Sequence, residues 1–146
     1  MDRDFISKNS IVIKAPMAKV WESLVNPEIA KTYFWGAEVT TDWQVGSPII
    51  FSGEFNGNKY EEKGTILQFK PEKLLQYTHW SNLEGIPDVP ENYRQWSFEL
   101  LAEGPDVTLS ITEDNIPTEQ QRKRSDEFWN EVLNTIKQLL EKNDGT

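Results

Sequence analysis

Residues 11–28 read IVIKAPMAKVWESLVNPE, a stretch in which a strand pattern gives way to two helix patterns. Apolar and polar side chains alternate over residues 5–13, which predicts a half-buried strand. Pro16 suits the first turn of a helix, and apolar side chains recur after it at helical spacing. The Asn-Pro-Glu signal at residues 26–28 predicts a second short helix that ends near Tyr33.

Strand-like segments and short turns follow these helices. Asn56-Gly57 predicts a tight hairpin, because both central positions of that turn need positive φ. Residues 81–92 are long for a hairpin connection and are expected to form a lid or rim over the sheet. The expected strands cover residues 36–43, 48–55, 60–69, 74–80, 93–101 and 106–112.

A long helix is expected at the end of the chain. Thr118 and Gln121 have the spacing of a capping box, and a wide apolar stripe follows them. An antiparallel sheet must bury one face, and this helix is its expected cover. Residues 143–146 are expected to fray. The stripe consists of Phe128, Trp129, Val132, Leu133, Ile136, Leu139 and Leu140.

The composition excludes several classes of function. The 146 residues predict one domain spanning 1–146, and the formal net charge of −9 argues against nucleic acid as a partner. With no cysteine, disulfides, thiolate nucleophiles and cysteine-containing zinc sites are absent. The sequence has no run of apolar residues long enough for a signal peptide or a membrane span, so we expect a cytoplasmic protein without membrane insertion.

Three stretches together resemble one superfamily. They are residues 11–28, KGTILQFKPEKLLQYTHW at 63–80 and FWNEVLNTIKQLLE at 128–141, and they resemble the START-like (SRPBCC) helix-grip proteins. Trp21 and Trp129 make the chain most similar to the family homologous to the C-terminal domain of the activator of the ninety-kilodalton heat-shock protein ATPase, the AHSA type. The resemblance implies an α+β fold. In it, a curved antiparallel seven-stranded sheet wraps around the C-terminal helix, with two short helices between strands one and two and an internal apolar cavity.

Aromatic side chains are unusually frequent, with six Trp, four Tyr and seven Phe. In residues 48–55 the odd positions are the more apolar, which predicts Phe51 and Phe55 inward and Glu54 outward. For each ring alone, ordinary core packing is the alternative. The residues predicted to bind a ligand are Trp35, Phe51, Phe55, Tyr77, His79, Trp96, Phe98, Trp129 and Leu133.

His79 is the only histidine, so any general-base chemistry that needs an imidazole depends on it. It is either a half-buried side chain bonded to a carbonyl or water, or a polar handle or base in the cavity. Glu61 and Glu62 are adjacent on a strand and point to opposite faces, which argues against paired-carboxylate catalysis between them. Both are interpreted as solvent-facing and edge charges. Asp88, Glu91 and Arg94 could form the mouth of the cavity.

We expect no cofactor and no metal site, because one histidine without cysteine leaves too few clustered ligands, and no phosphate-binding glycine motif occurs. The first functional hypothesis is a binder of a small apolar or aromatic molecule between the sheet and the C-terminal helix. The second is a co-chaperone-like or stress-related protein-interaction module. The third is a cavity enzyme of cyclase or hydrolase type, which ranks last. A monomer or a homodimer fits all three.

Overall fold

The computed structural model describes residues 5–142, and of Phe55 and Lys142 only the backbone. The expected tail at residues 143–146 lies outside the described residues. The elements are, in chain order, β1 (Phe5–Ile13), α1 (Met17–Val25), α2 (Pro27–Tyr33), β2 (Glu38–Thr40), β3 (Pro48–Phe55), β4 (Asn58–Lys70), β5 (Leu74–Ser81), the short 3-10 helices η1 (Asn82–Glu84) and η2 (Pro90–Asn92), β6 (Arg94–Glu103), β7 (Asp106–Ile116) and α3 (Glu119–Lys142).

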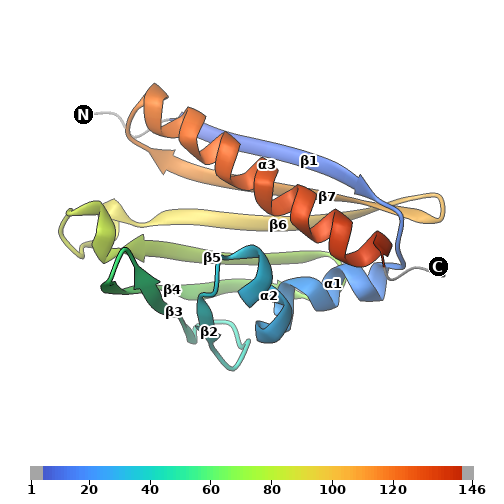
Figure 1. Cartoon of the computed structure of the whole chain (residues 1–146), viewed down its shortest axis with the longest axis horizontal. Helices are drawn as coiled ribbons and strands as arrows, with labels where there is room; N and C mark the ends of the chain where they lie inside the picture. The colour runs from blue at the N-terminus through green and yellow to red at the C-terminus, as the bar shows by residue number, and fades with distance from the viewer. Residues whose placement is uncertain (1–4, 143–146) are drawn as a thin grey trace.

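The seven strands form one antiparallel sheet in the order β1-β7-β6-β5-β4-β3-β2. Only the contact between β1 and β7 joins strands far apart in the sequence, and it brings the two ends of the sheet-forming chain together. Helix α3 runs along one face of the sheet, and α1 and α2 lie on the same face, with α2 packed next to β2 (Figure 1). The predicted fold class is therefore confirmed.

The core lies between α3 and the sheet. The apolar stripe of α3 faces inward, and Trp129, Val132 and Ile136 have no exposed surface. The predicted strand parity is confirmed at Phe51, which is 2% exposed, and Glu54 points outward as predicted. Alternation with a period of two thus selected the buried face correctly, because one face of this sheet packs against helices and the other meets water.

The lengths of β2 and β7 differ most from prediction. Strand β2 covers three residues instead of the predicted 36–43, since Asp42 caps an Asx turn by accepting from the Gln44 amide at 3.0 Å and Trp43 takes a φ of 61°. Strand β7 runs to Ile116, beyond the predicted end at residue 112. Its last part is held by Asn115, whose side-chain amide donates to the main-chain carbonyls of Glu91 and Tyr93, just before β6.

The predicted hairpin turn at Asn56-Gly57 and the predicted cap of the second helix are confirmed. Asn56 and Gly57 have φ values of 53° and 80°, as a tight hairpin requires. Asn26 accepts from the Glu28 amide at 3.0 Å and caps α2. Within residues 5–142, no helix is long and apolar enough to cross a membrane.

Candidate functional site

A pocket of about 800 Å³ lies between the sheet and the first turns of α3. The C-terminal end of α2 and the beginning of the 81–92 connection complete its wall. Its rings are Phe34, Trp35, Phe51, Tyr60, Trp96 and Phe128, joined by Ala37 and Leu83. Its polar side chains are Glu62, His79, Ser81, Glu84, Arg94, Glu113, Gln121, Arg124 and Ser125.

The aromatic wall is built around Phe34, the residue after α2. Its ring lies parallel to Phe128 of α3 at 6.3 Å between centroids and meets Phe51 of β3 edge-on at 5.9 Å. Such offset and edge-to-face contacts are the favourable geometries for aromatic pairs. Phe34 therefore links both sides of the pocket, and the rings leave flat apolar surfaces facing its interior.

Trp35 stands at the mouth of the pocket. Its side chain is 56% exposed, and its ring lies 5.2 Å from that of Phe128. The backbone of Trp35 has a φ of 51°, a left-handed position usually taken by glycine, while the amide of Gly36 bonds the Lys31 carbonyl at 2.7 Å and closes α2. A large ring is thus presented to solvent from a strained backbone position, a feature that is frequent at functional sites.

Ionisable side chains form a stripe across the inner end of the pocket. His79 of β5 and Arg94 of β6 are direct cross-strand partners and both point inward. Glu62 on β4 lies beside His79, and Glu113 on β7 lies beside Arg94. Four neighbouring strands therefore contribute one polar side chain each, in the order acid, imidazole, guanidinium, acid.

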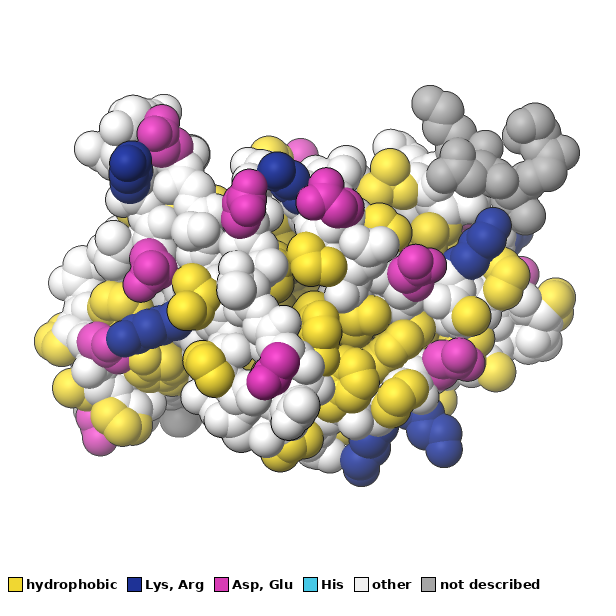
Figure 2. All heavy atoms as spheres, turned by 90° about the horizontal axis from the view of Figure 1, so that it is seen from below, with side chains coloured by type: hydrophobic (Ala, Val, Ile, Leu, Met, Phe, Trp, Pro, Cys, Tyr) yellow, Lys and Arg dark blue, Asp and Glu magenta, His cyan; other side chains and the backbone are white. Residues whose placement is uncertain are grey.

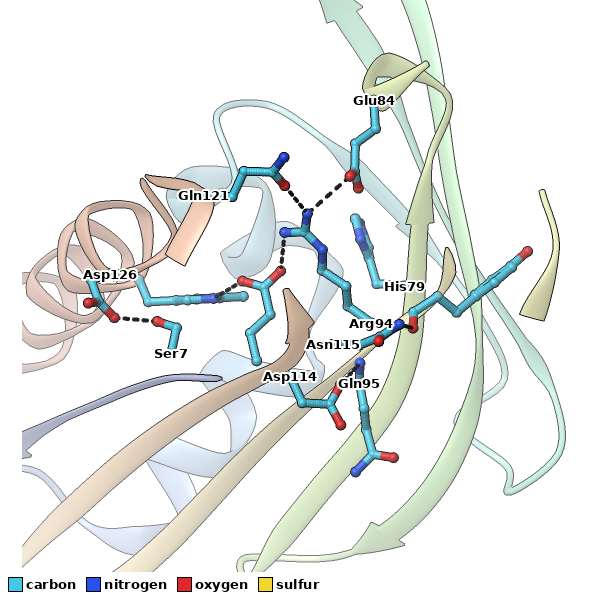
Figure 3. A network of polar contacts seen from close by, with 12 residues as sticks. Ser7, His79, Glu84, Arg94, Gln95, Asp114, Asn115, Gln121 and Asp126 are labelled. Carbon is cyan, nitrogen blue, oxygen red and sulfur yellow. Dashed lines mark hydrogen bonds and ion pairs between the residues drawn. The ribbon is translucent and has the colours of Figure 1, made fainter. Parts of the chain in front are cut away.

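Arg94 is the centre of this stripe. Its Nη1 donates to Glu113 Oε2 at 3.0 Å, and its Nη2 donates to Glu84 Oε2 at 3.1 Å and to Gln121 Oε1 at 2.7 Å (Figure 3). The Arg94 side chain is 10% exposed and that of Glu113 is 5% exposed. One guanidinium thus ties together the sheet, the 81–92 connection and the start of α3, and a buried charge of this kind requires such partners.

His79 and Glu62 form the second polar pair. Nε2 of His79 lies 3.0 Å from Oε1 of Glu62, and the imidazole stacks on Trp96 at 3.8 Å between centroids. Burial alone would raise the pKa of Glu62, but hydrogen bonds from His79 and Ser81 and the charge of His79 outweigh it and lower that pKa. The ring of His79 is therefore held on two sides, by a carboxylate and by an indole.

Two buried donors on β6 lack a partner. They are Nε of Arg94 and Nε1 of Trp96, for which no acceptor is found in the described part of the chain. Both residues line the pocket, and they are less than a tenth exposed. Buried donors are almost always hydrogen-bonded in folded proteins, so these two atoms single out the inner end of the pocket.

The predicted ligand-binding residues divide into two groups. Trp35, Phe51, His79 and Trp96 line the pocket. Four others are buried behind it in the core and are absent from its lining: Tyr77, Phe98, Trp129 and Leu133. Burial raises the pKa of the Tyr77 phenol, as expected for a ring enclosed by the core. The side chain of Phe55 lies outside the described residues.

Some polar positions were interpreted wrongly from the sequence. Glu62 was expected to face solvent, but it points into the pocket because it shares the strand parity of the buried Ile66. Asp88 was expected at the mouth of the pocket, but it pairs with Lys63 at 2.6 Å. Lys63 lies on β4 between Glu62 and Gly64, which have the inward parity, so its side chain is on the outer face of the sheet. The 81–92 connection therefore passes around the end of the sheet, with only its first part at the pocket.

A second hollow of about 590 Å³ lies along the β3–β4 hairpin. None of its lining residues is buried, and three of them are the carboxylates Glu38, Glu54 and Glu61. The two hollows share one ring, Tyr60, but the second has none of the other rings and none of the enclosed polar groups of the first pocket. Among residues 5–142, no group of three or more His, Asp or Glu side chains could hold a metal ion.

A long helix gripped by a curved antiparallel sheet, with a ring-lined pocket between them, defines the helix-grip class of proteins. The family described as "Activator of Hsp90 ATPase homolog 1-like protein" matches residues 14–141, and the chain belongs to this family. No curated protein matches the sequence.

Solved structures from several bacteria share the fold. The solution structure of ChR145 from Cytophaga hutchinsonii is 45% identical over 100% of both chains, with a TM-score of 0.87. The solution structure of the Aha1 dimer from Colwellia psychrerythraea is 21% identical, covers 97% of this chain and 99% of that one, and has a TM-score of 0.74. Protein MLL2253 from Mesorhizobium loti is 17% identical over 96% and 99% of the chains, with a TM-score of 0.78.

Proposed function

We propose that the protein binds a small apolar or aromatic molecule in the pocket between the sheet and α3. The observation that carries this proposal is the lining itself, in which six rings surround about 800 Å³. Pockets of this size, mostly apolar and with a few converging polar groups, are the usual form of small-molecule sites. Burial of the ligand's apolar surface would supply the affinity.

The polar stripe supports a binding role over a purely structural one. A charged network at the end of an apolar pocket is costly to bury, yet Arg94 and its two carboxylate partners lie beside the rings of this pocket. Its side chains can orient a ligand that enters through the mouth beside Trp35. Ring stacking would fix the plane of an aromatic ligand, and the stripe would decide which end points inward.

An NMR titration tests the proposal. The labelled protein is mixed with tetralin, a compact hydrocarbon of two fused rings, and then with sterols, fatty acids and flavonoids. We expect saturable amide shifts at Phe34, Phe51, Trp96 and Phe128. Shifts that scatter over the surface, or none with any compound, would count against a pocket ligand.

A pair of variants separates pocket binding from surface binding. Ser125 of α3 is 7% exposed and lines the pocket, so Ser125→Trp puts a large ring into the space and should weaken tetralin binding. Lys123 is exposed on the same helix and absent from the lining, so Lys123→Trp adds the same ring elsewhere. Equal affinities in the two variants would contradict the assigned site.

A protein-interaction role of the co-chaperone type is the second candidate. The family description names an activator of the Hsp90 ATPase, and hydrophobic side chains gather near the centre of the face seen from below, the side of α2 and β2 (Figures 1 and 2). ATP hydrolysis by purified Hsp90 is measured while the protein is added. A saturable rise would support this role, and an unchanged rate would exclude stimulation of that chaperone.

A further inference from the structure

The ligand class can be narrowed from the inner end of the pocket. We propose that the pocket takes an uncharged aromatic molecule that carries a carbonyl oxygen, and that this oxygen accepts a hydrogen bond from the indole N–H of Trp96. The inference rests on the proposed function, since it concerns the same pocket. Three features carry it: donors without acceptors, the balance of charge, and the arrangement of the rings.

The unpartnered donors call for an acceptor. Nε of Arg94 and Nε1 of Trp96 come from consecutive inward positions of β6, so they lie on the same face of one strand. A buried N–H without a partner is unfavourable, and a ligand acceptor that reaches it recovers this free energy on binding. A purely apolar ligand would leave both donors without an acceptor.

Trp96 is held in place by its neighbours. Its ring is stacked on His79 at 3.8 Å and meets Trp129 at 4.7 Å and 89°. Phe34 and Phe51 approach it from the apolar side of the pocket at 6.2 and 6.1 Å. A planar ligand resting against these rings would bring its polar end to the stripe, where the indole N–H belongs to a rigid side chain.

The charge balance argues that the acceptor is neutral. Arg94 is one cation facing two carboxylates, Glu84 and Glu113, and Glu62 adds a third beside His79. Arg124, the other cation of the lining, is exposed at the rim, where water weakens its field. A ligand carboxylate at the inner end would lose its hydration and meet carboxylates, which is unfavourable. A ketone oxygen accepts a hydrogen bond without that penalty.

The ligand reaches this end by moving a side chain at the rim. Both donor atoms are buried, so a neighbouring side chain must move before a ligand can reach them. Glu84, on the three-residue helix η1, is the more exposed partner of Arg94, at 28%. If Glu84 turns away from Arg94, Glu113 still keeps Arg94 paired, and the ligand oxygen can approach the donors of β6 from the rim. We therefore expect shifts at Glu84 as well as at Trp96 when the ketone binds.

Three matched ligands test the inference by NMR titration: tetralin, its ketone α-tetralone, and tetralin carboxylate. We expect α-tetralone to bind about five- to tenfold tighter than tetralin, which is the effect of one ordinary hydrogen bond. The carboxylate should bind more weakly than the ketone. The indole N–H resonance of Trp96 should move further downfield with the ketone than with tetralin, because only the ketone accepts its hydrogen bond.

Two variants identify the donor. Trp96→Phe keeps a ring but removes the N–H, so the ketone should fall to the affinity of tetralin. Trp80→Phe removes an indole N–H that donates to the Pro87 carbonyl away from the pocket lining, and it should change neither affinity. Equal binding of ketone and tetralin to the unmodified protein, a tighter carboxylate, or an unchanged preference in Trp96→Phe would each overturn the inference. Failure of these three ligands and also of sterols, fatty acids and flavonoids to bind would overturn the proposed function itself.

Discussion

Glu113 accepts a hydrogen bond from the indole Nε1 of Trp129 at 2.8 Å, and this bond joins the middle of α3 to β7. Trp129 has no exposed surface and Glu113 is 4% exposed, so the bond lies entirely in the interior. The other oxygen of the same carboxylate holds Arg94. The position of the long helix and the polar end of the pocket are therefore set by one side chain.

The substitution Glu113→Gln tests this coupling. The amide keeps the shape but loses the charge, so Arg94 retains only the half-exposed Glu84 as an anionic partner. Breaking a buried ion pair from one side leaves an uncompensated charge, and we expect a loss of about 3 kcal/mol in the free energy of unfolding. Urea denaturation measures it.

Glu103→Gln is the matched control, because Glu103 is an exposed residue at the end of β6. Its effect should stay within about 0.5 kcal/mol. If Glu113→Gln were equally mild, the carboxylate would not be the shared anchor of helix and pocket. The double variant Arg94→Met with Glu113→Gln should recover part of the loss, since it removes both charges together and keeps an acceptor for the Trp129 indole N–H.

Gly64 permits the close approach of β4 and β5. A Cβ atom at this position would lie 1.6 Å from the main-chain oxygen of Thr78, which cannot move without breaking the sheet. We expect Gly64→Ala to lower the free energy of unfolding by about 3 kcal/mol or more, because the backbone itself must shift. At Gly53 the nearest atom would be the Tyr60 hydroxyl, at 2.7 Å on a side chain that can turn aside. Gly53→Ala should therefore cost clearly less in the same urea experiment.

Glu62 gives the stability a specific pH dependence. Its pKa is lower in the folded protein than in the unfolded chain, so the folded state binds fewer protons in acid. The stabilisation from Glu62 is present above its ordinary pKa and is lost as the pH falls through the folded value. Between about pH 5 and pH 3 the unmodified protein should lose more stability than Glu62→Gln, as followed by thermal unfolding. Parallel curves for the two proteins would contradict this assignment.

Much of the fold is predictable from the sequence because its signals are local. Alternation over residues 5–13 predicted β1, and helical spacing around Trp129 predicted α3. The short helices followed from proline and a cap at residues 26–28. The end of β2 was missed since the turn after it depends on a left-handed Trp43, a conformation for which the residue type gives no signal.

The polar end of the pocket could not be predicted in the same way. Gln121 was expected to complete a capping box with Thr118, and the amide of Gln121 does bond the Thr118 hydroxyl at 3.1 Å. The side-chain oxygen of Gln121, which a capping box would turn back towards the main chain of Thr118, accepts a hydrogen bond from Arg94, 27 residues away in the sequence. Glu84 and Glu113 reach Arg94 from other elements. These pairings arise only when the sheet and α3 come together, so no spacing in the sequence encodes them.

Two substitutions at Trp35 separate the effect of its backbone strain on stability from the effect of its ring on ligand binding. Both Trp35→Ala and Trp35→Gly remove the ring at the mouth, and both should weaken tetralin binding to the same extent. Only alanine keeps the cost of a left-handed φ of 51°, so Trp35→Gly should be about 1 kcal/mol more stable than Trp35→Ala in urea denaturation. The exposed Leu101 provides the control, because Leu101→Gly in β6 should instead be less stable than Leu101→Ala. If Trp35→Ala were as stable as Trp35→Gly, the left-handed turn would carry no strain. If both bound tetralin normally, the ring at the mouth would not belong to the site.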